Sequence, residues 1–361
     1  MRTRVLVPVV SVTLVMVFGL WVQVRAAQAP SGTKSFDPAT TNTEAAVKAA
    51  ADAARLAAAA RVSWTPPRTP WGDPDLRGYW LSLSYTPLER PAELANKPFY
   101  TEQEAVAAFK KAVEADAEVD PRTVHYDWKE YGMDAWQSPV RPNLRTALII
   151  DPADGQIPAL TPEAQRRVAA ARRDRGDTVS TRGLYERCVT GNQGPPRVPG
   201  NHDAESQIIQ APGYVILLLQ SNSDARIIPL DGRPHLPSGV RQWLGDARGR
   251  WEANTLVIET TNFHPEREWR GSAGNLHLVE RLRRVDPKTI EYTFTVTDPT
   301  TWARPWTAEV HWPRIEPGMY EFACHEQNYG LINVVQGEQI RAREAAAQRG
   351  QPVRETPNAD R

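Results

Sequence analysis

The amino-acid sequence predicts an α+β protein that is mostly β-sheet. From residue 205 to about 330, apolar residues recur at every second position, which is the period of a half-buried strand, whereas helical periodicity is confined to short stretches on either side. Turn-forming residues separate the strand-like runs at short intervals, so neighbouring strands are expected to pair antiparallel. We therefore expect an up-and-down, lipocalin-like barrel or a curved sheet, wrapped by an N-terminal strap and two helices.

The first 29 residues have the features of an export signal. Two arginines precede an apolar run over 5–24, and an Ala-x-Ala-like site follows at 27–29. An uncleaved anchor is the alternative, because about 20 apolar residues can span a bilayer. Pro8 and Gly19 interrupt the run and favour cleavage. The sequence thus predicts a periplasmic or secreted protein with residues 1–29 as its signal peptide.

Residues 30–204 are predicted to precede the sheet. The alanine-rich stretch 30–62 has almost no large apolar residue, which is typical of a tether or a frayed helix. Residues 63–204 are expected to pack on the sheet, beginning with a strap at 64–98 that is rich in proline and aromatic residues. Thr101 and Glu104 form a capping box that begins one helix, and Thr161-Pro162 begins a second that runs to about Arg175.

The sheet itself is assigned to residues 205–337. Two strands are expected over 205–232, a strand–turn–strand unit over 249–263, and a hairpin over 276–297 with its turn at 286–288. Residues 290, 292, 294 and 296 are all apolar and alternate with polar residues, so one face of that strand should be buried. Residues 305–312 and 319–325 are expected to add two more strands. Residues 338–361 are predicted to form a C-terminal helix and a disordered tail.

The charge balance excludes several classes of partner. The full chain has 43 basic and 43 acidic residues, and removal of the signal takes away three arginines and no acidic residue. The remaining 40 basic and 43 acidic residues leave no basic footprint for nucleic acid and no polybasic run for anionic lipid. A small molecule is the partner that remains, with no membrane contact beyond the signal. The sequence leaves the oligomeric state open.

The chain has two cysteines, Cys188 and Cys324. In an exported protein an isolated pair is most simply a disulfide, here one that would enclose most of the C-terminal half. Two buried thiols or a reactive nucleophile are the alternatives.

Charged residues gather in the stretch 224–235. Asp224 and Arg226 should share one face of a strand, and the turn after it brings Asp231, Arg233 and His235 together. His235 could act as an acid or base oriented by Asp231, while Arg226 and Arg233 bind an anionic group. The alternative is an ordinary turn whose charges cap backbone groups.

Further candidates lie on the strands that follow. Trp243, Trp251 and Arg250 could form a wall on which a ligand stacks, although tryptophans at strand ends more often plug a barrel. Glu280 lies among leucines and is predicted to be buried, either as an acid with a raised pKa or in an ion pair with an arginine from a neighbouring strand.

The stretch 323–326 places Cys324 and His325 side by side. If this stretch is a strand, the two side chains point to opposite faces, so a local metal or catalytic site is not expected. His325 then faces Glu309 and His311 of the preceding strand, and joins His235, Asp231 and Glu280 as a catalytic candidate. The seven histidines are scattered and no cofactor motif occurs, so we predict no metal and no cofactor.

Four long strings resemble a widespread family of uncharacterised exported bacterial proteins. They are PWGDPDL (70–76), DARIIPLDGRPHLP (224–237), GRWEANTLVIETTNF (249–263) and ACHEQNYGL (323–331). The resemblance implies an exported protein with a common core and carries no assigned activity. Many members have a histidine where this chain has Ser223. If that histidine takes part in their chemistry, its absence here weakens an acid–base role for this strand.

Three functional hypotheses follow. The first is an exported enzyme acting on a small apolar, aromatic or sugar-like molecule by cofactor-independent acid–base chemistry. The content of 12 tryptophans and 10 tyrosines suits an apolar or aromatic ligand. The second is a periplasmic carrier of small hydrophobic ligands. The third is an envelope scaffold or interaction protein that docks through the strap at 64–98.

Overall fold

The computed structural model describes eight segments of the chain, which are residues 43–61, 64–117, 140–173, 178–191, 194–199, 204–315, 319–326 and 328–349. The predicted signal peptide, the first part of the tether and the C-terminal tail after 349 lie outside the described residues.

The described residues form one antiparallel sheet with four α-helices, which confirms the α+β, mostly β prediction. The sheet has ten strands: β1 Gly78–Leu81, β2 Ile149–Asp151, β3 Glu205–Ala211, β4 Tyr214–Leu219, β5 Ala225–Pro229, β6 Asp246–Glu252, β7 Thr255–Thr261, β8 His277–Asp286, β9 Thr289–Thr297 and β10 Trp306–Ile315. Their order is β5-β4-β3-β1-β10-β9-β8-β7-β6, with the short β2 paired to β10. Two meanders, β3–β5 and β6–β10, are thus joined through β1.

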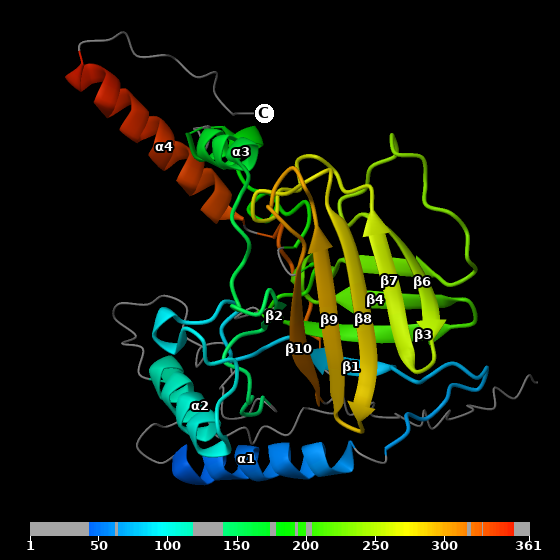
Figure 1. Ribbon diagram of the computed structural model, residues 1–361. Helices are drawn as coiled ribbons and strands as arrows, with labels where there is room; N and C mark the ends of the chain where they lie inside the picture. Colours follow the sequence, from blue (N-terminus) through cyan, green and yellow to red (C-terminus); the bar gives the residue numbers. More distant parts are fainter. Residues whose placement is uncertain are drawn as a thin grey trace, which may run out of the picture.

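The sheet bends strongly on itself, so that β3 and β4 lie behind β6–β9 and cross them at an angle (Figure 1). The two edge strands of the sheet, β5 and β6, come into contact. No hydrogen-bonded ladder joins them in the described part of the chain, so the sheet is curved but not closed into a barrel.

Three strand predictions need correction. Residues 205–232 form three strands, because Gly213 (φ +78°) allows a tight turn that splits the long apolar run. Residues 319–326 form no strand in the structure and instead lead through a turn into the last helix. The strap contains β1, which occupies the centre of the sheet between β3 and β10.

The helices lie outside the sheet. They are α1 Thr43–Ala60, α2 Glu102–Ala117, α3 Pro162–Arg173 and α4 Tyr329–Gln348. The capping box is confirmed at α2, where Thr101 N donates to Glu104 Oε2 (2.8 Å) and Glu104 N donates to Thr101 Oγ1 (3.3 Å). Thr161 likewise accepts a bond from Ala164 N at the start of α3 (3.1 Å). The last helix begins at residue 329, nine residues before the predicted start.

The tether residues that the structure describes form α1, which packs against α2 through small side chains. Val47 is buried in a cluster with Phe109 of α2, and Ala50 and Val106 pack against it. In Figure 1, α1 runs below the lower ends of the long strands and α4 extends away from the sheet at the opposite end of the molecule.

The concave side of the sheet is filled with large side chains. Trp80, Trp306, Trp312, Tyr292 and Phe294 are almost completely buried there, and four of their rings form a stacked pair and an edge-to-face pair. The predicted alternation is confirmed, since residues 290, 292, 294 and 296 are all 0% exposed. The interior is therefore a packed core.

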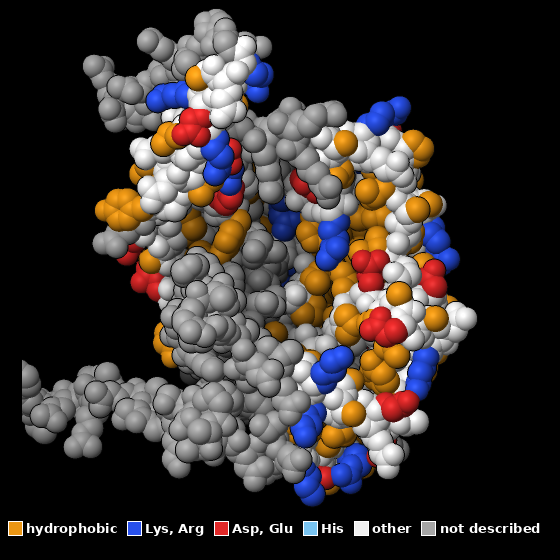
Figure 2. Space-filling view, turned by 90° about the vertical axis from the view of Figure 1, so that its left-hand side faces the viewer, with side chains coloured by type: hydrophobic (Ala, Val, Ile, Leu, Met, Phe, Trp, Pro, Cys, Tyr) orange, Lys and Arg blue, Asp and Glu red, His pale blue; other side chains and the backbone are white. Residues whose placement is uncertain are grey.

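Apolar side chains also occur on the surface. On the face drawn in Figure 2, hydrophobic side chains gather in and around a hollow, with charged side chains along its edge. Ile227 of β5 is 62% exposed, Tyr329 of α4 is 63% exposed and Ile332 of α4 is 52% exposed. None of the described helices is both long enough and apolar enough to cross a membrane.

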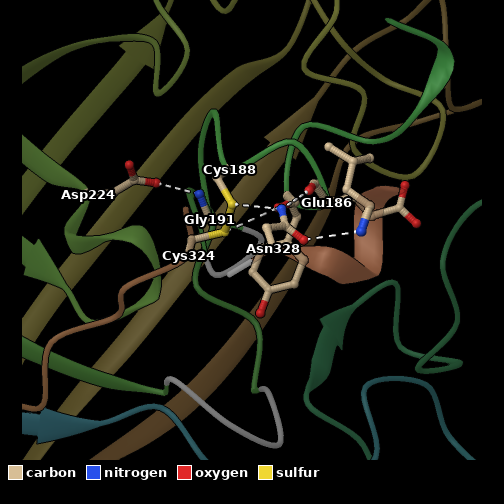
Figure 3. The surroundings of a disulfide bond; sticks show 8 residues. Glu186, Cys188, Gly191, Asp224, Cys324 and Asn328 are labelled. Atoms are coloured by element: carbon tan, nitrogen blue, oxygen red, sulfur yellow. Dashed lines mark hydrogen bonds between the residues drawn. A yellow bond between two sulfur atoms is a disulfide. The ribbon is translucent and has the colours of Figure 1, made fainter. Parts of the chain in front are cut away.

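The predicted disulfide is confirmed. Cys188 and Cys324 are bonded with a Cα–Cα distance of 5.6 Å, across 136 residues of chain. Figure 3 shows the bond beside Asn328, whose side chain donates to Glu186 O (2.9 Å) and accepts from Leu331 N (3.2 Å) at the start of α4. The bond thus fastens the beginning of α4 to the turn at 183–188. A largely buried disulfide is consistent with an oxidising extracellular compartment.

Candidate functional site

Glu280 forms a buried ion pair with Arg226. Arg226 Nη1 donates to Glu280 Oε1 at 3.0 Å, and Arg226 Nη2 donates to Glu280 Oε2 and to Thr260 Oγ1 (3.2 Å). The Tyr292 hydroxyl donates to Glu280 Oε1 at 2.7 Å. The prediction of a buried carboxylate is confirmed, but the expected partner from a neighbouring strand is wrong: β5 and β8 are not adjacent in the sheet, so the pair crosses the interior.

Burial and charge both act on this network. Burial lowers the pKa of Arg226, but the charge of Glu280 and its hydrogen bonds outweigh burial and leave that pKa raised. Burial and the nearby Glu280 carboxylate raise the pKa of Tyr292 well above its usual range. Arg226 is 3% exposed and Glu280 is 0% exposed, so no solute reaches either group in this conformation.

His235 lies next to a carboxylate, but the carboxylate is not Asp231. His235 Nδ1 lies 3.1 Å from Asp246 Oδ2, which also accepts from Leu236 N. Asp231 instead binds Arg233 within the turn, and both side chains are about half exposed. The orienting role predicted for Asp231 therefore has no geometric support.

Three of the remaining candidates are Arg250, Trp251 and Trp243. Arg250 is on the outer face of β6, where it binds Glu252, while Trp251 packs on the core from the other face. The ring of Trp243 lies 4.0 Å from that of His264. These three residues do not form the stacking wall that the sequence suggested.

Asp224 and His325 take local positions near the disulfide. Asp224 accepts from Thr190 Oγ1 (2.6 Å) and Gly191 N (2.8 Å), as Figure 3 shows for Gly191. His325 is exposed in the turn that follows Cys324. No contact between His325 and Glu309 or His311 occurs among the described residues, because 319–326 do not continue the sheet.

The described residues form a groove outside the sheet. It has a volume of about 650 Å³ and lies between α1, α2, the segment 140–145 and the outer face of β10. Its walls carry small apolar side chains, which are Ala51, Ala54, Ala58, Ala105, Val106 and Val140. Because the alanine side chains of α1 are small, they leave space between the helix and the sheet.

Glu309, His311 and Arg145 lie together on one side of this groove, whose lining also includes the polar residues Arg55, Arg61, Ser84, Glu102, Gln103, Arg141, Asn143 and Thr289. Strand alternation places Glu309 and His311 on the outer face of β10, opposite the buried Val310. Arg145 Nε donates to Glu309 Oε1 at 3.1 Å, and His311 Nε2 lies 3.4 Å from the same oxygen. The strand register sets Glu291 of β9 directly opposite His311.

Glu309 is ionised in this setting. Burial opposes its ionisation, but the neighbouring His311 and the positive charge of Arg145 outweigh burial and lower the pKa of Glu309 to about 2. An imidazole next to an ionised carboxylate is a common acid–base arrangement.

Sequence reasoning considered Glu309 and His311 only as neighbours of His325. Two signals could have found the cluster directly. The alternation of residues 306–312 puts both side chains on the polar face, and pairing of this strand with the preceding one brings Glu291 opposite them. No sequence pattern indicated that Arg145 and the helices line the groove. Residues 43–61 and 140–145 are far from β10 in the sequence and come next to it only in the folded protein.

Comparison with known proteins does not assign the chain. A scan against protein-family models finds no match, and a search of curated proteins finds no similar sequence.

Proposed function

We propose that the protein binds a small organic molecule in the groove between α1, α2 and the outer face of β10. The observation that carries this proposal is the groove itself: its volume of about 650 Å³ falls within the range of about 300–1,000 Å³ that is usual for small-molecule sites. Apolar walls with a few convergent polar groups are the usual composition of such sites. The ligand would place an apolar body against the alanines and a polar group near Glu309, His311 and Arg145.

This location differs from the lipocalin-like arrangement predicted from the sequence. The interior, where a lipocalin-like barrel would hold its ligand, is filled by Trp80, Trp306, Trp312 and the Arg226–Glu280 pair. A ligand outside the sheet needs no interior cavity. The disulfide supports export of this binding protein to the periplasm or the medium.

Acid–base catalysis on the bound molecule is the second candidate, because His311 lies beside the ionised Glu309 at the groove. Its test is turnover of a panel of p-nitrophenyl esters and glycosides, in which His311→Ala should lose activity and His277→Ala should keep it. The scaffold hypothesis stays a prediction, and deleting the strap at 64–98 cannot test it, because the deletion would remove β1 from the centre of the sheet.

Filling the groove should weaken binding. Ala54 of α1 lines the groove, whereas Ala59 of the same helix is exposed and does not. We expect Ala54→Trp to weaken binding of 1-anilinonaphthalene-8-sulfonate, an aromatic anion, at least about tenfold, which corresponds to about 1.4 kcal/mol. Fluorescence titration measures the affinity.

Ala59→Trp is the matched control and should bind the dye as the wild type does. Equal affinities for the wild type and Ala54→Trp, or no saturable binding by the wild type, would contradict the proposal.

A further inference from the structure

We propose that Glu291, Glu309 and His311 bind one divalent transition-metal ion, and that the occupant is Zn²⁺. One donor atom from each of these side chains lies within 4.8 Å of the other two. Adjacent antiparallel strands hold them, with Glu291 and His311 in register and Glu309 two residues along β10 on the same face. The three ligands are therefore fixed by the rigid part of the fold.

The spacing within the cluster fits shared coordination. His311 Nε2 and Glu309 Oε1 are 3.4 Å apart, and Nε2 is a buried atom that meets no hydrogen-bond criterion with any group in the described part of the chain. Two ligands at about 2.0–2.2 Å from a tetrahedral Zn²⁺ lie roughly 3.3–3.6 Å from each other. The pair is thus spaced as two ligands of one ion would be.

The donor set selects the kind of ion. One imidazole nitrogen and two carboxylate oxygens suit Zn²⁺ and similar transition metals, whereas Mg²⁺ and Ca²⁺ prefer oxygen ligands alone. Three protein ligands also leave a coordination position open, as in catalytic rather than structural zinc sites.

Two arginines modify the charge of the site. Arg145 binds Glu309, and Arg283 Nη2 donates to Glu291 Oε1 at 2.8 Å. Each carboxylate keeps a second oxygen or lone pair for the metal, so the arginines can act as outer partners that orient the ligands. Because they already balance the two carboxylates, the charge of the ion would attract an anionic group of a molecule in the groove.

This inference goes beyond the proposed binding function and can fail separately from it. Metal binding depends on the polar cluster, whereas dye binding depends on the apolar wall at Ala54. The dye titration is done with metal-free protein, so one result does not decide the other.

The test is a titration of the purified, tag-free and chelator-treated protein with Zn²⁺ by isothermal titration calorimetry. We expect one ion per chain. His311→Ala and Glu291→Gln should each weaken binding roughly 100-fold or more, since loss of even outer-shell partners costs about 10- to 100-fold. Substitution with Co²⁺ should give the visible absorption of a tetrahedral site in the wild type and not in His311→Ala.

His277→Ala is the matched control. His277 Nε2 lies 2.8 Å from Glu259 Oε1 on the same outer face of the sheet, but this pair belongs to no three-residue cluster in the described chain. The control should bind Zn²⁺ as the wild type does. The proposal is overturned if the wild type binds no stoichiometric ion, or if His311→Ala, with an unchanged melting temperature, binds as tightly as the wild type.

Discussion

Glu280→Gln is expected to lower the free energy of unfolding by about 3–5 kcal/mol, the usual cost of breaking a buried ion pair by removing one partner. The substitution keeps the shape of the side chain but leaves the guanidinium of Arg226, 3% exposed, without a counter-charge. Arginine cannot lose its proton to escape this cost. Equilibrium unfolding in urea measures the change.

The reverse substitution should cost less. In Arg226→Met the unpaired group is Glu280, a carboxyl that can take up a proton and remain buried as a neutral acid hydrogen-bonded to Tyr292. The double variant Arg226→Met/Glu280→Leu should recover most of the loss, because apolar replacements of a buried pair are often neutral or stabilising.

Glu259→Gln provides the control, since it removes a carboxylate from the partly exposed His277–Glu259 pair. We expect a change of less than about 1 kcal/mol there. If Glu259→Gln and Glu280→Gln lower the free energy of unfolding by similar amounts, the buried ion pair stabilises the protein no more than the exposed pair does.

The pair also shows where sequence reasoning stops. Alternation correctly placed Glu280 on an inward face, because that pattern is local to its strand, whereas Arg226 was expected to bind an anionic group. Their contact depends on the curvature that brings β5 over β8, and 54 residues separate the two in the chain. Periodicity has no information about curvature, so the expected partner was an arginine from an adjacent strand.

The candidate site was less predictable than the fold. The hairpins, the capping box and the disulfide follow from short motifs whose physical basis is local. The groove instead arises because the small side chains of α1 do not fill the space between this helix and the outer face of β10. The stretch 319–326 was misjudged because its alternation resembles a strand, although the disulfide and the cap at Asn328 direct it into a helix.

Removing the disulfide is the second large effect that we expect. In Cys188→Ala/Cys324→Ala the unfolded chain gains the freedom of a loop that spans 136 residues. The chain-entropy relation puts the loss of stability at about 5 kcal/mol, an upper value because residual structure in the unfolded state reduces it. Urea unfolding of the oxidised wild type and of the double variant measures this difference.

The loss should have a local as well as a global part. The disulfide joins the start of α4 to the turn at 183–188, and among the apolar residues of α4 only Val335 is buried. In the variant the hydrogen bond from Asn328 Nδ2 to Cys188 Sγ is lost as well, and the bond from Asn328 Nδ2 to Glu186 O (2.9 Å) remains as a link between the start of this helix and that turn. Limited proteolysis should therefore cut the variant first between 319 and 349, while hydrogen exchange in β7–β9 stays slow. Equal protection of α4 in both proteins would mean that its attachment does not depend on the disulfide.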